Sequence, residues 1–484
     1  SKATGKTVEK DISDKRKILM TISTAMNEIK YIDTRGGCKE PISFSETVVK
    51  GISGSGGLFV PERIPKLELN QIIELSNLPY WQRAAKIYKA FETDFSDAEI
   101  EELMKKSYGE NFDSKEICPI NFGNDDVHTL ELWHGPTSAF KDMALQNLPH
   151  VFSASAEKLR KAGKLDHEFL ILVATSGDTG KAALEGFADV PGVSVMVLYP
   201  KDGVSDIQRK QMLTQEGSNV NVVGIDGVFD DCQNIVKEIF NSEEFAKELL
   251  SGIEFKPVAL SSANSINWGR LMPQIVYYLS SYSMLVKRKA IDPGEKIDVC
   301  VPTGNFGNIL AAWYAKQMGT PIDKLICASN ENRILTDFIE SGIYDISERE
   351  FILTPSPSMD ILISSNLERQ LFELSGRNAE QISAWMQDLK DTKCFQVNEE
   401  CKQAMSQNYL CGSIDSQTCL DTIKDVFEKR GYLIDTHTAV AYKIAEDLKS
   451  DKPVLVASTA HWAKFGKNVY KALNGIGVSE PLPS

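Results

Sequence analysis

The sequence lacks the features that place a protein in a membrane or on nucleic acid. It has no run of about 18 apolar residues, the length that a transmembrane helix requires. The formal net charge is −14 and no basic block stands out, which argues against a general binder of nucleic acid or membrane surfaces. The start of the chain is polar and has no apolar core of the kind found in a signal peptide. We therefore expect a cytoplasmic protein without nucleic-acid or membrane partners, and we expect residues 1–26 to be a flexible leader.

Paired cysteines are also missing. The nine cysteines include no C-x-x-C pair, and the group between Cys394 and Cys419 is spaced too irregularly for a zinc site. An odd number of cysteines without a secretory signal is typical of free thiols in a reducing compartment. No metal site is expected, and most of these thiols should be small buried hydrophobic residues.

Two common phosphate-binding signatures are absent as well. Residues 174–180 (Ala-Thr-Ser-Gly-Asp-Thr-Gly) precede Lys181 and look at first like a Walker loop. Thr175, however, stands in place of the first glycine, and Ala182 in place of the Ser or Thr that binds magnesium. Residues 302–308 (Pro-Thr-Gly-Asn-Phe-Gly-Asn) do not follow the G-x-G-x-x-G pattern. A P-loop kinase or nucleotide hydrolase is therefore excluded, and a dinucleotide site is not indicated.

What the sequence does contain is an alternation of strands and helices. Residues 27–125 read as a mixed, mostly helical unit, and residues 360–430 read mainly as helices packed outside the sheets. Between and after these regions, short apolar runs recur as they do in parallel strands buried on both faces. The expected strands are residues 127–133, 169–174, 193–198, 220–225, 257–260, 297–301, 325–328 and 454–457. This pattern predicts an α/β fold with right-handed crossovers.

One lysine lies in an unusual position at the start of an expected helix. Residues 131–142 read as the end of a strand, a turn at Gly135 and Pro136, and a helix that begins near Thr137. Lys141 then lies in the first turns of that helix, where the partial positive charge of the N-terminus disfavours a cation. Most lysines are solvated surface groups, but a destabilised ammonium loses its proton more easily and becomes a nucleophile. Lys141 is therefore a candidate functional residue.

Three strand ends carry small and hydroxyl-bearing residues, and ligands bind at such ends of parallel sheets. Residues 174–180 suit an anion or ligand at a helix start, with an ordinary connecting turn as the alternative. Residues 302–308 would cradle a phosphate dianion through glycine amides. Residues 457–462 place hydroxyls where they can bond a heteroaromatic nitrogen, whereas His461 alone is more often structural. A lysine, a phosphate cradle and a neutral hydroxyl together indicate pyridoxal phosphate.

Several separated motifs resemble those of one family. Residues 132–142 are similar to the cofactor-lysine motif of threonine synthases of the longer bacterial and fungal type. The further motifs that resemble this family are residues 31–36, 56–61, 175–180, 265–270, 304–308, 355–361 and 364–369. The resemblance covers roughly residues 31–470 and implies fold type II of the pyridoxal-phosphate enzymes.

That resemblance implies two α/β sheet domains and an additional, mostly helical N-terminal domain. The N-terminal domain would comprise residues 27–125. A large cofactor-binding domain would be formed by residues 126–150 together with residues 263–484, and a smaller α/β domain by residues 151–262. The active site is then expected between the two α/β domains.

The resemblance also implies an activity and a set of site residues. The activity is the lyase reaction that converts O-phospho-L-homoserine and water into L-threonine and phosphate, so the substrate would be a phosphorylated amino acid. Lys141 would form the Schiff base with the cofactor and move protons, and Thr459 would face the pyridine nitrogen. The cofactor phosphate would be held by Gly304, Asn305, Phe306, Gly307 and Asn308. The residues implied on the substrate side are Ser176, Gly177, Asp178, Thr179, Ser265, Asn267 and Arg270. Arg270 suits a phosphate because its guanidinium is a planar, permanently charged fork.

Two positions depart from the family's usual pattern, and rival activities stay open. Trp462 and Thr436 each replace a proline, which leaves the shape of their loops open. A phospho-lyase that releases 2-oxobutyrate and phosphate would share nearly every motif. A threonine or serine dehydratase is disfavoured by Arg270, and a non-catalytic binding protein on the same fold is disfavoured by the intact Lys141. The resemblance to the longer threonine synthases also implies a monomer, and we expect one here.

Overall fold

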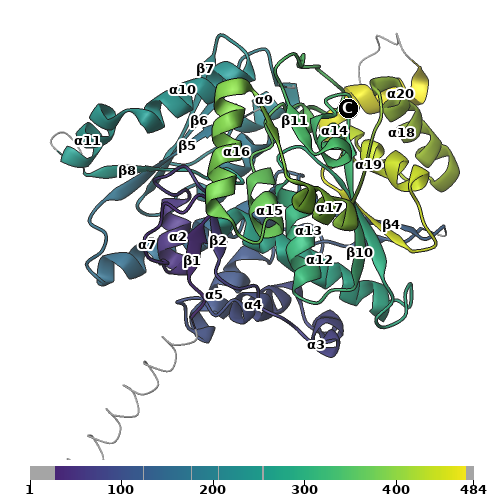
Figure 1. Ribbon diagram of the computed structural model, residues 1–484, viewed down its shortest axis with the longest axis horizontal. Helices are drawn as coiled ribbons and strands as arrows, with labels where there is room; N and C mark the ends of the chain where they lie inside the picture. Colours follow the sequence, from purple (N-terminus) through teal and green to yellow (C-terminus); the bar gives the residue numbers. More distant parts are fainter. Residues whose placement is uncertain (1–27, 124, 176, 205, 253–255, 476–484) are drawn as a thin grey trace, which may run out of the picture.

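Two β-sheets with helices on their faces form the body of the molecule (Figure 1). The computed structural model describes residues 28–475 except residues 124, 176, 205 and 253–255. The expected leader at residues 1–26 lies outside these described residues. Within the described part of the chain, no helix combines the length and the hydropathy needed to cross a bilayer. The predicted alternation of strands and helices is observed.

The larger sheet has six strands and carries most of the predicted site residues at its edge. Its strand order is β13-β10-β9-β14-β4-β3, and all neighbours are parallel except β3 and β4. The strands are β3 (Ile120–Asn121), β4 (Val127–Glu131), β9 (Ile297–Pro302), β10 (Ile322–Ser329), β13 (Tyr409–Ser413) and β14 (Val454–Ser458). Every residue of β9 and β14 is buried, as expected for strands covered on both faces.

Alternate residues of these strands enter two separate cores. Val299 and Leu455 join the core that contains α12 (Trp268–Lys287) and α13 (Gly307–Gln317). Cys300 and Val456 point the other way, into the core formed with α18 (Ser416–Arg430), α19 (Thr436–Asp447) and α20 (Gly466–Asn474). The two-residue period of a strand therefore sets which helices each face binds.

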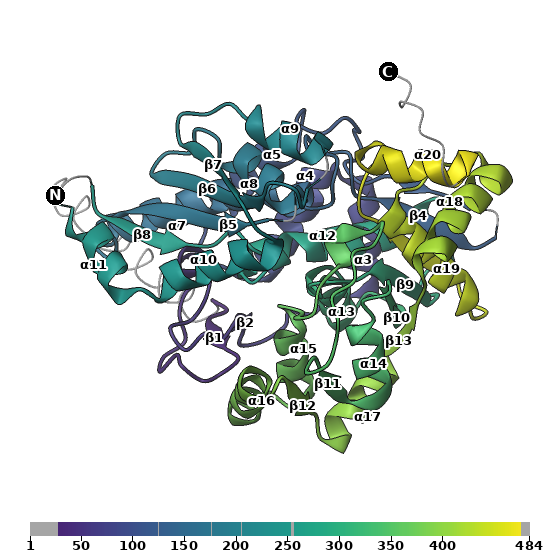
Figure 2. The same cartoon turned by 90° about the horizontal axis from the view of Figure 1, so that it is seen from above.

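The smaller sheet consists of four parallel strands in the order β7-β6-β5-β8. The strands are β5 (Glu168–Ala174), β6 (Val193–Pro200), β7 (Val220–Ile225) and β8 (Val258–Ser261). The helices around them are α8 (Asp178–Phe187), α9 (Asp206–Leu213), α10 (Phe229–Asn241) and α11 (Glu243–Ser251). Seen from above in Figure 2, this sheet lies on one side of α12, and β9, β10 and β13 lie on the other.

The N-terminal region is mostly helical, as expected, and packs directly on the rest of the chain. Its elements are β1 (Tyr31–Asp33), α2 (Phe44–Lys50), β2 (Phe59–Pro61), α3 (Leu69–Glu74), α4 (Tyr80–Ala90) and α5 (Asp97–Ser107). Helices α2, α3 and α4 pack on α12, and α2 and α5 pack on α7 (Leu148–Lys161). Trp268 at the start of α12 contacts the rings of Tyr31 and Phe91, so this region shares a core with the larger sheet.

The region from residue 360 to residue 430 is mainly helical but also contains an unexpected strand of the larger sheet. Its helices are α15 (Leu367–Leu374), α16 (Ala379–Thr392), α17 (Glu399–Asn408) and α18. Strand β13 forms the edge of the sheet beside β10, with Cys411 opposite Cys327. Gly412 and Ser413 interrupt any apolar run there, so only the pairing with β10 reveals the strand.

Candidate functional site

The carboxyl ends of three neighbouring strands meet at one edge of the larger sheet. Strands β9, β14 and β4 are adjacent and parallel, so the residues that follow them are brought together. The Leu132 amide donates to the Ser458 carbonyl (3.0 Å), and the Phe140 amide donates to the Thr459 carbonyl (2.7 Å). Lys141, the predicted cradle and Thr459 therefore lie at the same edge although they are far apart in the sequence.

The turn before Lys141 is not helical, which corrects the expected helix start near Thr137. Helix α6 (Asp142–Leu145) begins directly after Lys141, which is its N-cap residue. Ser138 has a φ of 58°, and its carbonyl accepts from the His461 amide (3.0 Å). Residues 138–140 thus pair with the chain beyond β14, and this long-range pairing replaces the hydrogen bonds of a helix.

The buried carboxylate of Asp142 stabilises this turn by hydrogen bonds. One carboxylate oxygen accepts from the Thr137 amide (2.8 Å) and the other from the Thr137 hydroxyl (2.7 Å). Burial raises the pKa of Asp142 to about 6, against the effect of these hydrogen bonds. Gly135 packs so closely on Asp142 that an added Cβ would lie 2.4 Å from the Asp142 Cβ. The glycine, threonine and aspartate of this motif are therefore requirements of one tight turn.

Lys141 has an ammonium without a hydrogen-bond partner among the described residues. Burial lowers the pKa of Lys141 to about 8; Arg270 and Lys464 act in the same direction and Asp178 opposes them. Helix α6 has only four residues, so its dipole is weak and is not the main cause. A pKa near 8 leaves a substantial fraction of neutral amine near physiological pH, as a nucleophile or a base requires.

The residues predicted to form a phosphate cradle lie in the loop at the start of α13. Phe306 is the N-cap residue with a φ of 66°, and Gly307 opens the helix. The amides of residues 304–306 donate to no other described part of the backbone, and the first amides of a helix have no partner within it. The Gly304 carbonyl accepts from the Ser364 hydroxyl (2.7 Å), which fixes the loop, while Asn305 is exposed.

Asn308 adds a polarised donor to this cradle. Its side-chain oxygen accepts from the hydroxyls of Tyr277 (2.6 Å) and Tyr278 (2.5 Å). Its Nδ2 group is buried and has no partner among the described residues. A buried unpaired donor is costly, so this group fits a site that holds an anion.

The two hydroxyls at the end of β14 differ in what they contact. The Ser458 hydroxyl accepts from the Trp133 indole (3.0 Å) and bonds the Thr438 hydroxyl (3.0 Å), so its role is structural. The Thr459 hydroxyl makes no hydrogen bond with described residues and is free for a ligand. His461 accepts from the Ala463 amide (3.2 Å) and caps the next turn, the structural alternative expected for it.

The loop after β5 brings Asp178 to the site from the smaller sheet. The Thr175 hydroxyl accepts from the amides of Gly177 (2.9 Å) and Gly180 (2.8 Å). Gly177 has a φ of 134°, and a Cβ there would lie 2.3 Å from the Gln208 side chain. Thr179 is half-buried and its hydroxyl has no partner among the described residues. Ser176, which the motif also predicted, lies outside the described residues.

The three residues predicted to hold the substrate phosphate differ in how free they are. Asn267 caps α12, and its amide group also donates to the Val48 carbonyl (2.9 Å), so its polar atoms are occupied. The Ser265 hydroxyl accepts from Asn366 (3.1 Å) and retains its own proton for a ligand. Arg270 is 2% exposed, bonds one carbonyl, that of Ala263, and leaves its Nε without a partner among the described residues. Burial lowers the pKa of Arg270 to about 10, and a guanidinium this poorly paired favours an anionic ligand.

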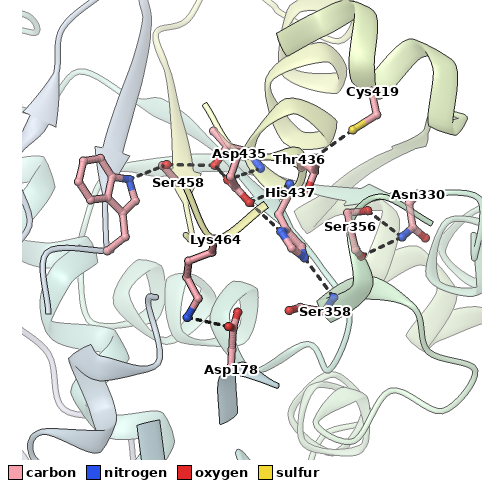
Figure 3. Close-up of polar contacts among 12 residues, drawn as sticks. Asp178, Asn330, Ser356, Ser358, Cys419, Asp435, Thr436, His437, Ser458 and Lys464 are labelled. Atoms are coloured by element: carbon pink, nitrogen blue, oxygen red, sulfur yellow. Dashed lines mark hydrogen bonds and ion pairs between the residues drawn. The ribbon is translucent and has the colours of Figure 1, made fainter. Parts of the chain in front are cut away.

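Lys464 is a site residue that the sequence did not reveal. It lies in the short 3-10 helix η3 (Trp462–Phe465), and only 4% of it is exposed. Its ammonium bonds Asp178 (2.7 Å) and the Thr137 carbonyl (2.7 Å), as Figure 3 shows for the pair with Asp178. The available signal was a lysine between Ala463 and Phe465, six residues after the end of β14.

His437 is a second residue that the sequence did not single out. The Ser358 amide donates to its Nε2 (3.1 Å), and its Nδ1 bonds Asp435 (2.7 Å), so the ring proton lies on Nδ1 (Figure 3). Ser358 in turn abuts the cradle, since a Cβ on Gly304 would lie 2.9 Å from the Ser358 carbonyl oxygen. Through these hydrogen bonds, Asp435 and His437 hold the loop around Ser358 next to Gly304, the first residue of the predicted cradle.

Thr436 lies between these two residues, at a position where a proline would be compatible with the backbone. It is the first residue of α19, its amide donates to no described residue, and Asp435 before it is extended. Its hydroxyl is buried without a partner among the described residues. The structure thus gives no local reason for threonine at this position.

We predict that Thr436→Pro stabilises the protein by about 1 kcal/mol. Proline at the first helical position restricts the unfolded chain and removes the unpaired hydroxyl. Differential scanning calorimetry should show a higher midpoint of unfolding, and Thr436→Val, which removes only the hydroxyl, should give a smaller rise. A lower midpoint for Thr436→Pro would contradict the prediction.

Three family models match the chain. The model described as "Threonine synthase N terminus" matches residues 30–108, and "Pyridoxal-phosphate dependent enzyme" matches residues 122–459. The model described as "Threonine synthase, C-terminal" matches residues 438–484.

Individual relatives cover most of the chain. Threonine synthase-like 1 of Macaca fascicularis is 42% identical over 460 residues, which are 92% of this chain and 60% of that protein. Threonine synthase of Saccharomyces cerevisiae is 36% identical over 474 residues, which cover 92% of this chain and 89% of that protein. The chain spans about 60% of the length of the threonine synthase-like 1 proteins that it matches.

A solved structure agrees with the fold. The crystal structure of threonine synthase from Brucella melitensis with bound pyridoxal phosphate is 38% identical and matches with a TM-score of 0.84. The match covers 94% of this chain and 93% of that one. The predicted fold type is therefore confirmed.

Proposed function

Because the chain belongs to the threonine synthase family of pyridoxal-phosphate-dependent enzymes, we propose that it converts O-phospho-L-homoserine and water into L-threonine and phosphate. The predicted family and its cofactor are confirmed by these matches. The observation that carries the proposed reaction is the poorly paired, buried guanidinium of Arg270 near the amine of Lys141, which has no hydrogen-bond partner among the described residues. One binds a phosphate, and the other joins the cofactor.

The residues at the edge of the larger sheet fit this cofactor. The amides of residues 304–308 and the Nδ2 of Asn308, which have no hydrogen-bond partner within the described part of the chain, would hold its phosphate, and the Thr459 hydroxyl would meet its ring nitrogen. Lys141 would join its aldehyde. When bound, the cofactor acts as an electron sink that acidifies carbon–hydrogen bonds of the substrate.

The chain's own groups then supply proton transfer and phosphate binding. Lys141, with a pKa near 8, takes and returns a proton near neutral pH. Arg270 orients the substrate by its phosphate, and the Ser265 and Thr179 hydroxyls are free to donate to the same ligand. The side-chain amide of Asn267 already donates to the Val48 and Ser262 carbonyls, and its oxygen caps α12, so it positions α12 instead of binding the substrate phosphate.

A phospho-lyase that yields 2-oxobutyrate, ammonia and phosphate from the same substrate and water is the second candidate. It would use the same lysine, cradle and arginine. One observation favours keeping it: Trp462, which replaces the family's usual proline, follows Thr459 closely in the sequence. An altered loop there would change whether water reaches the substrate.

The product distinguishes the two reactions. Purified protein with O-phospho-L-homoserine in ¹⁸O-labelled water should release phosphate and threonine in equal amounts, with the label in the threonine hydroxyl. Release of 2-oxobutyrate in place of threonine would establish the phospho-lyase. Absence of phosphate release by a protein that holds its cofactor would contradict both.

We also propose that the protein is a cytoplasmic monomer. Its site would lie between two α/β domains, one formed by residues 126–150 together with residues 263–484 and the other by residues 151–262. All nine cysteines are free, including Cys327 and Cys411 on adjacent strands, which fits a reducing compartment. The pairing of Asp178 with Lys464 across the two sheets supports a site between the domains. Light scattering that gives the mass of more than one chain would contradict the monomer.

A further inference from the structure

Lys464 and Asp178 form a buried ion pair between the two sheets. Lys464 comes from the segment after β14 of the larger sheet, and Asp178 opens α8 beside β5 of the smaller sheet. Their side chains are 3% and 4% exposed, and Nζ and Oδ1 lie 2.7 Å apart (Figure 3). The pair therefore joins two elements that no local sequence relation brings together.

The ammonium of Lys464 also reaches the turn that carries the cofactor lysine. Its second contact is the Thr137 carbonyl at 2.7 Å, and Thr137 is held by Asp142, the residue after Lys141. Asp178 has a second partner in the Gln208 carboxamide (3.1 Å). Each member of the pair is thus fixed from a second direction, which limits the positions that Asp178 can take relative to Lys141.

Burial of this pair is not explained by stability alone. Two buried charges lose more hydration energy than their mutual attraction returns, unless further hydrogen bonds support them. Replacing a buried ion pair with apolar residues of similar volume is therefore often neutral or stabilising. Lys464 lies between Ala463 and Phe465, where an apolar side chain would match its neighbours. A charge held at this point shifts the pKa of a neighbouring ionisable group.

We propose that Lys464 is a positioning residue of the site, which holds Asp178 beside Lys141 and with it sets the charge carried by the Lys141 amine. The inference uses the proposed function only in taking Lys141 as the lysine that joins the cofactor. Beyond that function, Lys464 and Asp178 together determine which fraction of the Lys141 amine is neutral.

The charges around Lys141 come from four elements. Arg270 of α12 and Lys464 of η3 repel its ammonium, and Asp178 of α8 attracts it. On its own element, Asp142 is occupied by Thr137 and faces Lys464. Against burial, which would raise it, the ammonium groups of Lys464 and Lys141 hold the pKa of Asp178 well below its usual range, so Asp178 stays charged at neutral pH.

Substitutions of the two partners must therefore act in opposite directions. Lys464→Met removes one repelling cation and leaves Asp178 without its main partner beside Lys141, and both effects favour the protonated amine. Asp178→Asn removes the attracting anion and leaves both cations, which favours the neutral amine. A loss of packing alone would not produce opposite signs.

The test is the pH dependence of Lys141 acylation in the cofactor-free, full-length protein. Acetic anhydride is applied in short pulses from about pH 6 to about pH 10, and the Lys141 peptide is quantified by mass spectrometry. The midpoint should lie near 8 in the wild type. It should rise by about one pH unit in Lys464→Met and fall in Asp178→Asn.

Matched variants complete the experiment. Lys464→Arg keeps the charge and should keep the midpoint within about half a pH unit. Lys467→Met is the control on the same segment, because Lys467 is exposed and pairs with Asp206 of α9 (3.2 Å) away from the site. It should leave the midpoint unchanged.

An unchanged midpoint in Lys464→Met, or shifts of the same sign in both charge-removing variants, would overturn the proposal. If Lys464→Met does not fold, the fall in Asp178→Asn together with the constancy of Lys464→Arg decides the question. The assay needs neither cofactor nor substrate. Failure of the proposed function would appear instead as turnover or cofactor binding that survives without Lys141.

Discussion

Replacing Lys141 with alanine is expected to abolish the visible absorption of the bound cofactor and to reduce turnover by roughly 10²–10⁴-fold. Lys141 has an amine that is partly neutral near physiological pH and has no hydrogen-bond partner among the described residues. Lys464, the neighbouring buried lysine, bonds Asp178 and the Thr137 carbonyl and cannot take its place without breaking both contacts. The absorption spectrum of the purified variant after incubation with pyridoxal phosphate is the measurement.

The fold should survive this substitution. Removal of a desolvated ammonium that has no hydrogen-bond partner among the described residues relieves a cost, so the midpoint of thermal unfolding of the cofactor-free protein should not fall. Lys443→Ala, which removes a surface lysine of α19, is the matched control and should retain both absorption and activity. Retention of the visible band by Lys141→Ala would remove the central assignment of the site.

Arg270→Ala should lower kcat/KM for O-phospho-L-homoserine by about 30- to 1,000-fold, mainly through a higher KM, while the cofactor stays bound. The range corresponds to about 2–4 kcal/mol, the usual loss when one partner of a buried, hydrogen-bonded charge pair is removed. Cofactor binding should persist because the cradle is built on α13, whereas Arg270 belongs to α12. Steady-state kinetics and the absorption spectrum, measured on the same sample, separate the two effects.

Two comparisons sharpen this prediction. Arg270→Lys keeps the charge but loses the planar fork, so it should recover part of the affinity and not all of it. Inorganic phosphate should inhibit the wild type competitively and inhibit Arg270→Ala much more weakly. If Arg270→Ala keeps the KM of the wild type, the substrate phosphate is held by other residues.

The positions of the main ligand groups followed from the sequence because they depend on a short-range pattern. Residues 304–308 and Thr459 follow the apolar strands β9 and β14, and Lys141 follows β4 after a turn; parallel strands place such ends at one edge. The structure places them there. The roles assigned to these residues toward cofactor and substrate stay predictions that the variants above would test.

Features that depend on long-range pairing were not predicted. The expected helix near Thr137 is absent because residues 138–140 pair with the chain beyond β14, and β13 exists because β10 pairs with it. Asn267 had the residue type of a phosphate ligand, yet its side chain is occupied by the cap of α12 and the Val48 carbonyl. No window of sequence contains these partners.

The sequence by itself determined the fold class, the succession of the buried parallel strands apart from β13, and the identity of the residues at the strand ends, since these follow from local periodicity and from the residue types present. Only the tertiary structure decided the charge environment of Lys141. The sequence suggested a helix dipole as the cause of a weakened ammonium. In the folded protein the causes are burial and the charges of Arg270, Lys464 and Asp178, from three other elements. Electrostatic energies depend on distance and burial in space, and the chain acquires both only when its two sheets pack together.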